Sequence, residues 1–178
     1  MSRIHHLYQS HHHKGSEGFT AIELLVVISI IAVLASLAGP SFSGLIERWR
    51  VRSAVEDLQS VLYYARAEAI KRGGNVTLEP ASGGWTSGWE VKNGGTTLQT
   101  SPAPTRVDIR LADSSDANVS GSIGADQWGQ LASTAGSGQV FVFRLTPAGA
   151  SASSPAATSL CVYPAGSIRR LGDGSGAC

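Results

Sequence analysis

The residue with the clearest chemical potential is Glu23, a carboxylate near the start of an otherwise apolar run. From Leu24 to Gly39 the chain carries no charge, and its only polar side chains are two serines. A charge inside a membrane segment costs about 2.5–3.5 kcal/mol or more, so it usually marks a partner and a function. A cut after Gly18 would create such a partner, because Phe19 would then carry a free amine that Glu23 of a neighbouring subunit could neutralise.

Histidine, the commonest general base and metal ligand, is confined to the first 18 residues of the chain. If residues 1–18 are removed as a leader, the mature chain contains no histidine, which excludes Ser-His-Asp and Cys-His catalytic sets. The two cysteines are too few for a zinc site. We therefore expect no enzyme, no metal site and no cofactor. The histidines are His5, His6, His11, His12 and His13.

A long helix must position Glu23. From Phe19 to Gly39 a helix would be roughly 30 Å long, which matches the hydrocarbon core of a bilayer, so 19–39 is predicted to cross a membrane. Residues 40–74 predict an amphipathic continuation, with apolar residues at alternating spacings of four and three opposite a charged face. Gly73 and Gly74 are expected to end the helix. The apolar stripe comprises Val51, Val55, Leu58, Leu62, Ala65 and Ala69.

From Asn75 the apolar period changes to two, which predicts a β-rich domain over 75–178. Glycine pairs at Gly83-Gly84 and Gly94-Gly95 predict hairpin turns. The expected strands are Val76–Glu79, Trp89–Lys92, Thr97–Gln99, Arg106–Leu111, Asn118–Ile123, Gln139–Leu145, Leu160–Tyr163 and Ser167–Leu171. The tryptophans Trp85, Trp89 and Trp128 are expected in the core or packed on the helix, and a carbohydrate-binding platform is the alternative. A long helix whose stripe is covered by an antiparallel sheet is an α+β fold.

The stretch from Gly18 to Val27, Gly-Phe-Thr-Ala-Ile-Glu-Leu-Leu-Val-Val, resembles the processing site of type IV pilins and type II secretion pseudopilins. The resemblance implies that prepilin peptidase cuts after Gly18 and that the new N-terminal Phe19 is N-methylated. It also implies that Glu23 guides assembly with other pilins. The fold it implies is pilin-like: a long N-terminal helix, half in the membrane and half amphipathic, packed on the β-sheet domain.

An ordinary secretory signal peptide is the alternative interpretation of the same segment. Arg3 and Lys14 supply a basic region, and Ser36-Leu37-Ala38 resembles a small-x-small cleavage site. That interpretation predicts an exported soluble protein that begins at Gly39. It leaves Glu23 without a role, and the helical pattern continues past Ala38 without a break, so we favour the first interpretation.

The two cysteines, Cys161 and Cys178, lie near the C-terminus, in a part of the chain that the anchor would place outside the cytoplasm. In an oxidising compartment a disulfide between them is the default expectation. It would close the last eighteen residues into a loop and contribute on the order of 3 kcal/mol.

Within the pilin-like group, Phe143-Arg-Leu-Thr-Pro-Ala-Gly149 followed by a cysteine-bounded tail looks like the GspH/FimT subgroup, whose minor pilins and pseudopilins sit at or near a fibre tip. Some FimT-type members carry a basic Gly-Arg-x-Arg motif linked to DNA capture. The corresponding stretch here is Gly166-Ser-Ile-Arg169-Arg170, in which Ser167 replaces the first arginine of the motif and the two arginines are adjacent. Neighbours in a strand point to opposite faces, so Arg169 and Arg170 would reach one phosphate backbone only if the hairpin twists.

These observations predict a minor pilin or pseudopilin, anchored in the inner membrane by one helix with its C-terminal domain in the periplasm, and part of a pilus or pseudopilus after assembly. Its expected partners are prepilin peptidase and other pilins. The alternative is a tip subunit that binds double-stranded DNA through Arg169 and Arg170 during DNA uptake.

Overall fold

The computed structural model describes residues 18–134, 139–172, 174, 175 and 178, and for residues 37–41 it describes the backbone alone. The predicted leader, apart from Gly18, and its five histidines lie outside the described residues, as do the side chains of the small-x-small sequence at Leu37 and Ala38. The chain divides into two compact units, Met1–Ser41 and Phe42–Cys178, which are described separately.

The first unit contains the start of α1, a helix assigned from Ala21 to Arg72. Thr20 caps it, because its Oγ1 accepts the N–H of Glu23 at 3.2 Å. The hydroxyls of Ser29 and Ser36 donate to carbonyls of the preceding turn, so the two serines of the apolar run are satisfied within the helix. The large apolar side chains of this unit, from Phe19 to Leu34, are exposed.

No helix among the described residues is long and apolar enough to cross a membrane. The segment predicted to do so, 19–39, runs into positions whose side chains lie outside the description. The transmembrane assignment therefore stays a prediction.

In the second unit, α1 buries the predicted apolar stripe. Val51, Val55, Leu58, Leu62 and Ala69 have no exposed surface. The helix ends as its glycines predict: Gly73 and Gly74 take φ values of 78° and 100°, and the N–H of Gly74 donates to the carbonyl of Ala69 at 2.7 Å.

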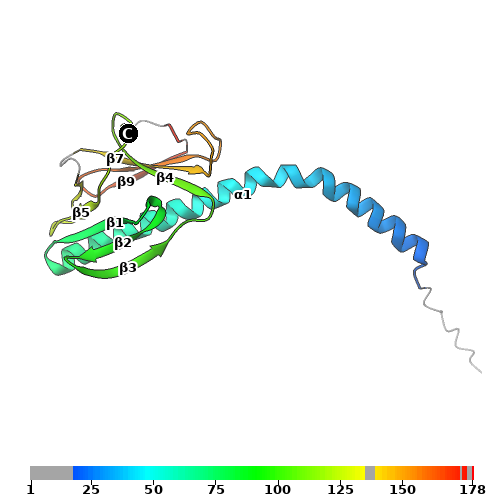
Figure 1. Cartoon of the computed structure of the whole chain (residues 1–178), viewed down its shortest axis with the longest axis horizontal. Coiled ribbons are helices and arrows are strands. Elements are labelled where there is room, and N and C mark those ends of the chain that lie inside the picture. Colours follow the sequence, from blue (N-terminus) through cyan, green and yellow to red (C-terminus); the bar gives the residue numbers. More distant parts are fainter. Residues whose placement is uncertain (1–17, 135–138, 173, 176–177) are drawn as a thin grey trace, which may run out of the picture. The chain divides into compact units, whose positions relative to one another are not determined.

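Two antiparallel sheets lie on this part of α1 (Figure 1). The first has the order β3-β2-β1-β5-β6 and the second the order β4-β7-β8-β9. The strands of the first are β1 (Val76–Ala81), β2 (Gly84–Asn93), β3 (Thr96–Pro102), β5 (Ile123–Ala125) and β6 (Leu131–Ser133). Those of the second are β4 (Val107–Asp113), β7 (Phe141–Pro147), β8 (Thr158–Val162) and β9 (Ile168–Leu171).

One apolar core joins the helix to both sheets. Trp85 of β2 meets Phe143 of β7 edge to face, with ring centroids 4.8 Å apart, so an aromatic contact connects the sheets directly. Trp89 is also buried, at 2% exposure, as expected. The predicted α+β fold, a helix packed against antiparallel sheets, is confirmed.

Two expectations were wrong, for the strand at Asn118–Ile123 and for Trp128, and one strand, β6, was missed. The strand predicted at Asn118–Ile123 begins only at Ile123, because the chain first turns at Asp116 (φ 67°) and Gly121 (φ 140°), which breaks extended pairing. Strand β6 was not predicted, since three residues are too few to show a period of two. Trp128 is 73% exposed rather than in the core. The remaining expected strands are confirmed, with ends that differ by a few residues.

Candidate functional site

The predicted processing site lies in an exposed, non-helical stretch before α1. Phe19 is 84% exposed, and a side chain added at Gly18 would meet nothing within 4 Å. The bond between these two residues is therefore not masked by any part of the chain that the structure describes.

Glu23 lies in the first turn of the helix, four residues after Phe19. A carboxylate at this position interacts favourably with the helix dipole. It makes no ion pair with any described residue, although the side chains around it are apolar and exposed. The α-amine that a cut before Phe19 would create is a cation that could pair with this acid.

The disulfide between Cys161 and Cys178 is present. Its Cα atoms are 5.8 Å apart, within the usual range, and Cys161 is buried in β8. The bond joins the C-terminus to the second sheet, beside the strand that carries Arg169 and Arg170.

Arg169 and Arg170 do not converge. Across the ladder Arg169 lies opposite Cys161, on the outer face of the sheet, whereas Arg170 lies opposite the core residue Leu160. Arg170 also approaches α1, with its Nη1 3.6 Å from Oε1 of Glu56. The two arginine side chains therefore lie on opposite faces of β9, as the sequence predicted. The charge of Arg170 is partly neutralised by Glu56.

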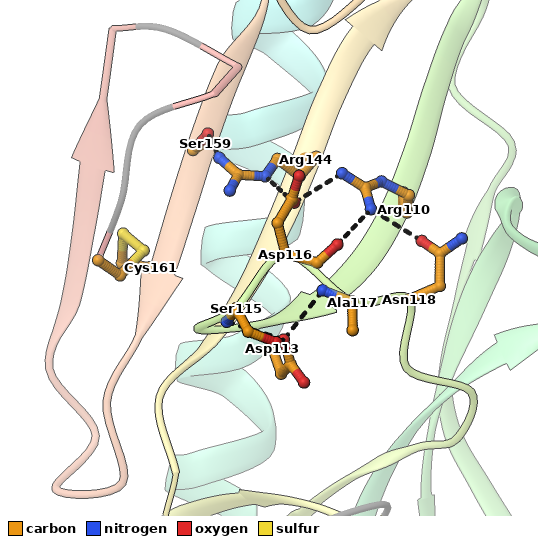
Figure 2. Close-up of polar contacts among 10 residues, drawn as sticks. Arg110, Asp113, Ser115, Asp116, Ala117, Asn118, Arg144, Ser159 and Cys161 are labelled. Atoms are coloured by element: carbon orange, nitrogen blue, oxygen red, sulfur yellow. Dashed lines mark hydrogen bonds and ion pairs between the residues drawn. A yellow bond between two sulfur atoms is a disulfide. The ribbon is translucent and has the colours of Figure 1, made fainter.

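A cluster that the sequence analysis missed lies on the outer face of the second sheet, where Asp116 is held by two arginines (Figure 2). Its Oδ1 accepts from Arg110 at 2.7 Å and from Arg144 at 2.9 Å. Arg144 is only 6% exposed and also donates to the hydroxyl of Ser159 at 2.8 Å. Arg110, Arg144 and Ser159 face one another across three neighbouring strands, which a register prediction could have revealed.

The electrostatics of this turn favour charged carboxylates. Burial raises the pKa of Asp116, but the hydrogen bonds from Arg144 and Arg110 outweigh it and place the pKa below its ordinary value. The pKa of Asp113 is lowered chiefly by the hydroxyl of Ser115, with help from the N–H groups of Ala117 and Ser115. The cluster is a bracing network for the 113–118 turn, in which the charge of Asp116 is paired with both arginines.

Arg66 on α1 holds the turn of the β8–β9 hairpin, whose second strand carries Arg169 and Arg170. Its Nη1 donates to the carbonyl of Gly166 at 3.1 Å, in the turn between β8 and β9. A Cβ at Gly166 would lie 2.5 Å from the guanidinium carbon, and one at Gly129 would lie 2.8 Å from Nε, so glycine at both positions lets the guanidinium fit between two turns. No sequence signal distinguishes this arginine from its exposed neighbours on the helix.

Among the described residues no group of three or more His, Cys, Asp or Glu side chains is arranged to hold a metal ion. Among those residues the geometry offers an acid on an apolar helix, Glu23, and an exposed arginine on a strand edge, Arg169, neither with an ion pair to a described residue, together with a braced β-domain. Such features suit assembly and binding rather than bond chemistry.

The sequence matches the family "Type II transport protein GspH" over residues 54–172. It is also 38% identical over 63 residues to two fimbrial proteins of Pseudomonas aeruginosa. That match covers 35% of this chain and 40% of each fimbrial protein, so the chain spans well under half the length of these relatives.

Solved structures show the same fold. The Pseudomonas aeruginosa type IV minor pilin FimU superposes in one crystal form with a TM-score of 0.55 at 18% identity, covering 74% of this chain and 94% of FimU. In a second crystal form the TM-score is 0.53 at 19% identity, with 71% and 96% covered. At such identities the likeness shows a shared architecture alone.

Proposed function

The chain belongs to the GspH family of type II transport proteins, which are structural, non-enzymatic pilin-like subunits, and we propose that it is processed by prepilin peptidase and assembles as a minor pilin or pseudopilin. The fibre is a type IV pilus or a type II secretion pseudopilus. Before assembly the subunit is held in the inner membrane by residues 19–39, with its C-terminal domain in the periplasm. Cleavage after Gly18 is followed by N-methylation of Phe19.

The observation that carries this proposal is the unpaired Glu23 in the first turn of an exposed apolar helix. In lipid no water is available to solvate the carboxylate, so its charge is costly until a cation arrives. The amine of Phe19 on a neighbouring subunit is such a cation. Opposite unit charges about 4 Å apart attract by about 4 kcal/mol at an effective dielectric constant of about 20.

This pairing makes assembly selective. A subunit alone in the bilayer keeps its acid unpaired, and a subunit in a fibre pairs it, so the electrostatic gain appears only on incorporation. The β-domain contributes a rigid body, because its core, its terminal disulfide and the Asp116 cluster are complete within one chain. The resemblance of Phe143–Gly149 and the cysteine-bounded tail to the GspH/FimT subgroup supports a place at or near the fibre tip rather than in the shaft.

Sequencing the N-terminus of the membrane-extracted protein tests the processing step. We expect the mature chain to begin at Phe19, with a mass increase of one methyl group. A chain that begins at Gly39 would establish the signal-peptide alternative and remove Glu23 from the mature protein. A chain that keeps Met1 would overturn processing altogether. Gly18→Trp should block cleavage, while Gly15→Trp in the leader serves as the matched control.

Capture of double-stranded DNA is a second candidate function, favoured by one observation. Arg169 is exposed and forms no ion pair with any described residue. Two or three phosphate contacts would give weak, strongly salt-dependent binding. A gel-shift titration at two salt concentrations tests the idea: Arg169→Ala should weaken retardation more than Arg170→Ala, since Arg170 already approaches Glu56. Absence of retardation by the parent protein at low salt would remove this candidate.

A further inference from the structure

A groove of about 540 Å³ lies in the second unit, between α1 and the end of β3. One wall is helical, with Trp49, Arg50 and Asp57 along it, and the other is formed by β3 and residues 102–105. Its volume falls within the range of about 300–1,000 Å³ that small-molecule sites occupy. Nothing in the pairing of Glu23 with a neighbour uses these residues.

The groove contains two indole rings with different roles. Trp49 is 68% exposed, and its ring is therefore available as a flat apolar platform. Trp89 is buried, yet its Nε1 has no hydrogen-bond partner among the described residues. That N–H has almost no accessible surface, so Trp49 is the ring that a ligand in the groove could contact.

The charges in the groove balance. Arg50 and Asp57 are seven residues apart, two helical turns, and so share one face of α1. Neither forms an ion pair with a described residue, which leaves one cation and one anion available to a ligand. A net-neutral ligand with many hydroxyls satisfies both, since a guanidinium donates to hydroxyl oxygens and a carboxylate accepts from hydroxyl hydrogens. Gln99 on β3 adds a side-chain amide, which can both donate to and accept from ligand hydroxyls.

We propose that this groove binds a short neutral saccharide. The apolar face of a sugar ring stacks on Trp49, and its hydroxyls are shared among Arg50, Asp57 and Gln99. An anionic ligand would be repelled by Asp57 as much as it is attracted by Arg50. The inference goes beyond the proposed function, because the groove lies wholly within Phe42–Cys178 and does not depend on processing at Gly18.

The test uses the full-length chain in detergent and a panel of neutral disaccharides: maltose, cellobiose, lactose and diacetylchitobiose. Saturable binding followed by tryptophan fluorescence is expected for at least one of them. Trp49→Ala should weaken that binding roughly tenfold or more. The matched control is Trp128→Ala, which removes an equally exposed indole outside the groove and should leave the affinity unchanged.

A second pair of measurements distinguishes a neutral saccharide in the groove from an anionic one. Affinity for the bound disaccharide should stay constant as salt is raised. Digalacturonic acid should bind more weakly at every salt concentration, because its carboxylates would lose hydration that the balanced charges of Arg50 and Asp57 do not replace. The proposal is overturned if no disaccharide binds saturably, or if Trp49→Ala and Trp128→Ala lower affinity equally. If no disaccharide binds and Trp49→Ala lowers incorporation into fibres, the groove is instead a contact between subunits. Gln99→Ala, on the opposite wall, should repeat the effect of Trp49→Ala.

Discussion

The two units of the chain differ in how their apolar side chains are covered. In the first unit, up to Ser41, the described apolar side chains are exposed, and Glu23 has no partner among the described residues. In the second, from Phe42 onward, the stripe on the same helix is covered by two sheets, and the buried Arg144 is paired. The second unit is therefore specified by its own contacts, whereas we propose that the first is completed by other molecules.

The largest difference between the two units is expected when one apolar side chain is shortened in each. Leu58→Ala removes a fully buried side chain from the core and should lower the free energy of unfolding by about 2–5 kcal/mol. Leu25→Ala, the matched change in the exposed part of the helix, should leave the unfolding of the β-domain unchanged. Chemical denaturation of the detergent-solubilised chain measures both, and equal losses would contradict the comparison.

The disulfide tests how far the second unit depends on its own covalent closure. Cys178→Ser opens the terminal loop and should lower the free energy of unfolding by about 3 kcal/mol, because the unfolded chain regains its freedom. Reduction of the parent protein with dithiothreitol should cause the same loss. Dithiothreitol should have no further effect on the variant, and an additional loss there would show that the reductant acts elsewhere.

The paired acid of the second unit predicts a dependence on pH. Because the folded pKa of Asp116 lies below its ordinary value of about 3.9, its stabilising effect is complete above that ordinary value. The effect is lost as the pH falls through the lowered folded pKa. Asp116→Asn tolerates the positive φ and should cost about 1–2 kcal/mol at pH 7.

From pH 7 down through the lowered folded pKa of Asp116, the difference in stability between that variant and the parent should shrink, since the parent carboxylate becomes protonated. Asp108→Asn is a suitable control on the same sheet, because Asp108 accepts from the N–H of Gly149 and meets no arginine among the described residues. A constant difference between Asp116→Asn and the parent across this pH range would show that the two arginines do not stabilise the charge.

The smallest effect is expected on the surface of the helix. Arg52 and Glu56 form an exposed pair one turn apart, with Nε 3.0 Å from Oε1. Arg52→Ala should change the free energy of unfolding by no more than about 0.5 kcal/mol. Thermal unfolding measures the change, and a loss as large as that of Leu58→Ala would mean that surface charge, rather than the core, holds the second unit together.

The sequence predicted what depends on local pattern. The helical stripe, the glycines that end α1 and most strands are visible as periods and turn residues, and they are confirmed. The error at Asn118–Ile123 arose because the turn around Asp116 is stabilised by Arg110 and Arg144, which lie on other strands. Exposure of Trp128 likewise depends on the turn at Asp126, where Oδ1 of Asp126 accepts hydrogen bonds from the N–H groups of Trp128 and Gln130.

The same limit applies to the candidate sites. Gly18, Phe19 and Glu23 are close in sequence, so their spacing alone suggests a joint role. Arg66, by contrast, acts on a turn about a hundred residues later, and the groove at Trp49 requires β3 to pass beside the helix. No spacing in the sequence reports such contacts, because they exist only once the sheets have covered α1.

The most direct test of the account is the incorporation of Glu23→Gln into fibres. The variant keeps the shape of the side chain but removes the charge that is proposed to pair with the amine of Phe19 in a neighbour. Quantified in sheared fibres against the membrane pool, it should be incorporated at least roughly tenfold less than the parent. Glu47→Gln, which removes an exposed acid further along the same helix, should be incorporated normally. Incorporation of Glu23→Gln at the parental level would contradict the account.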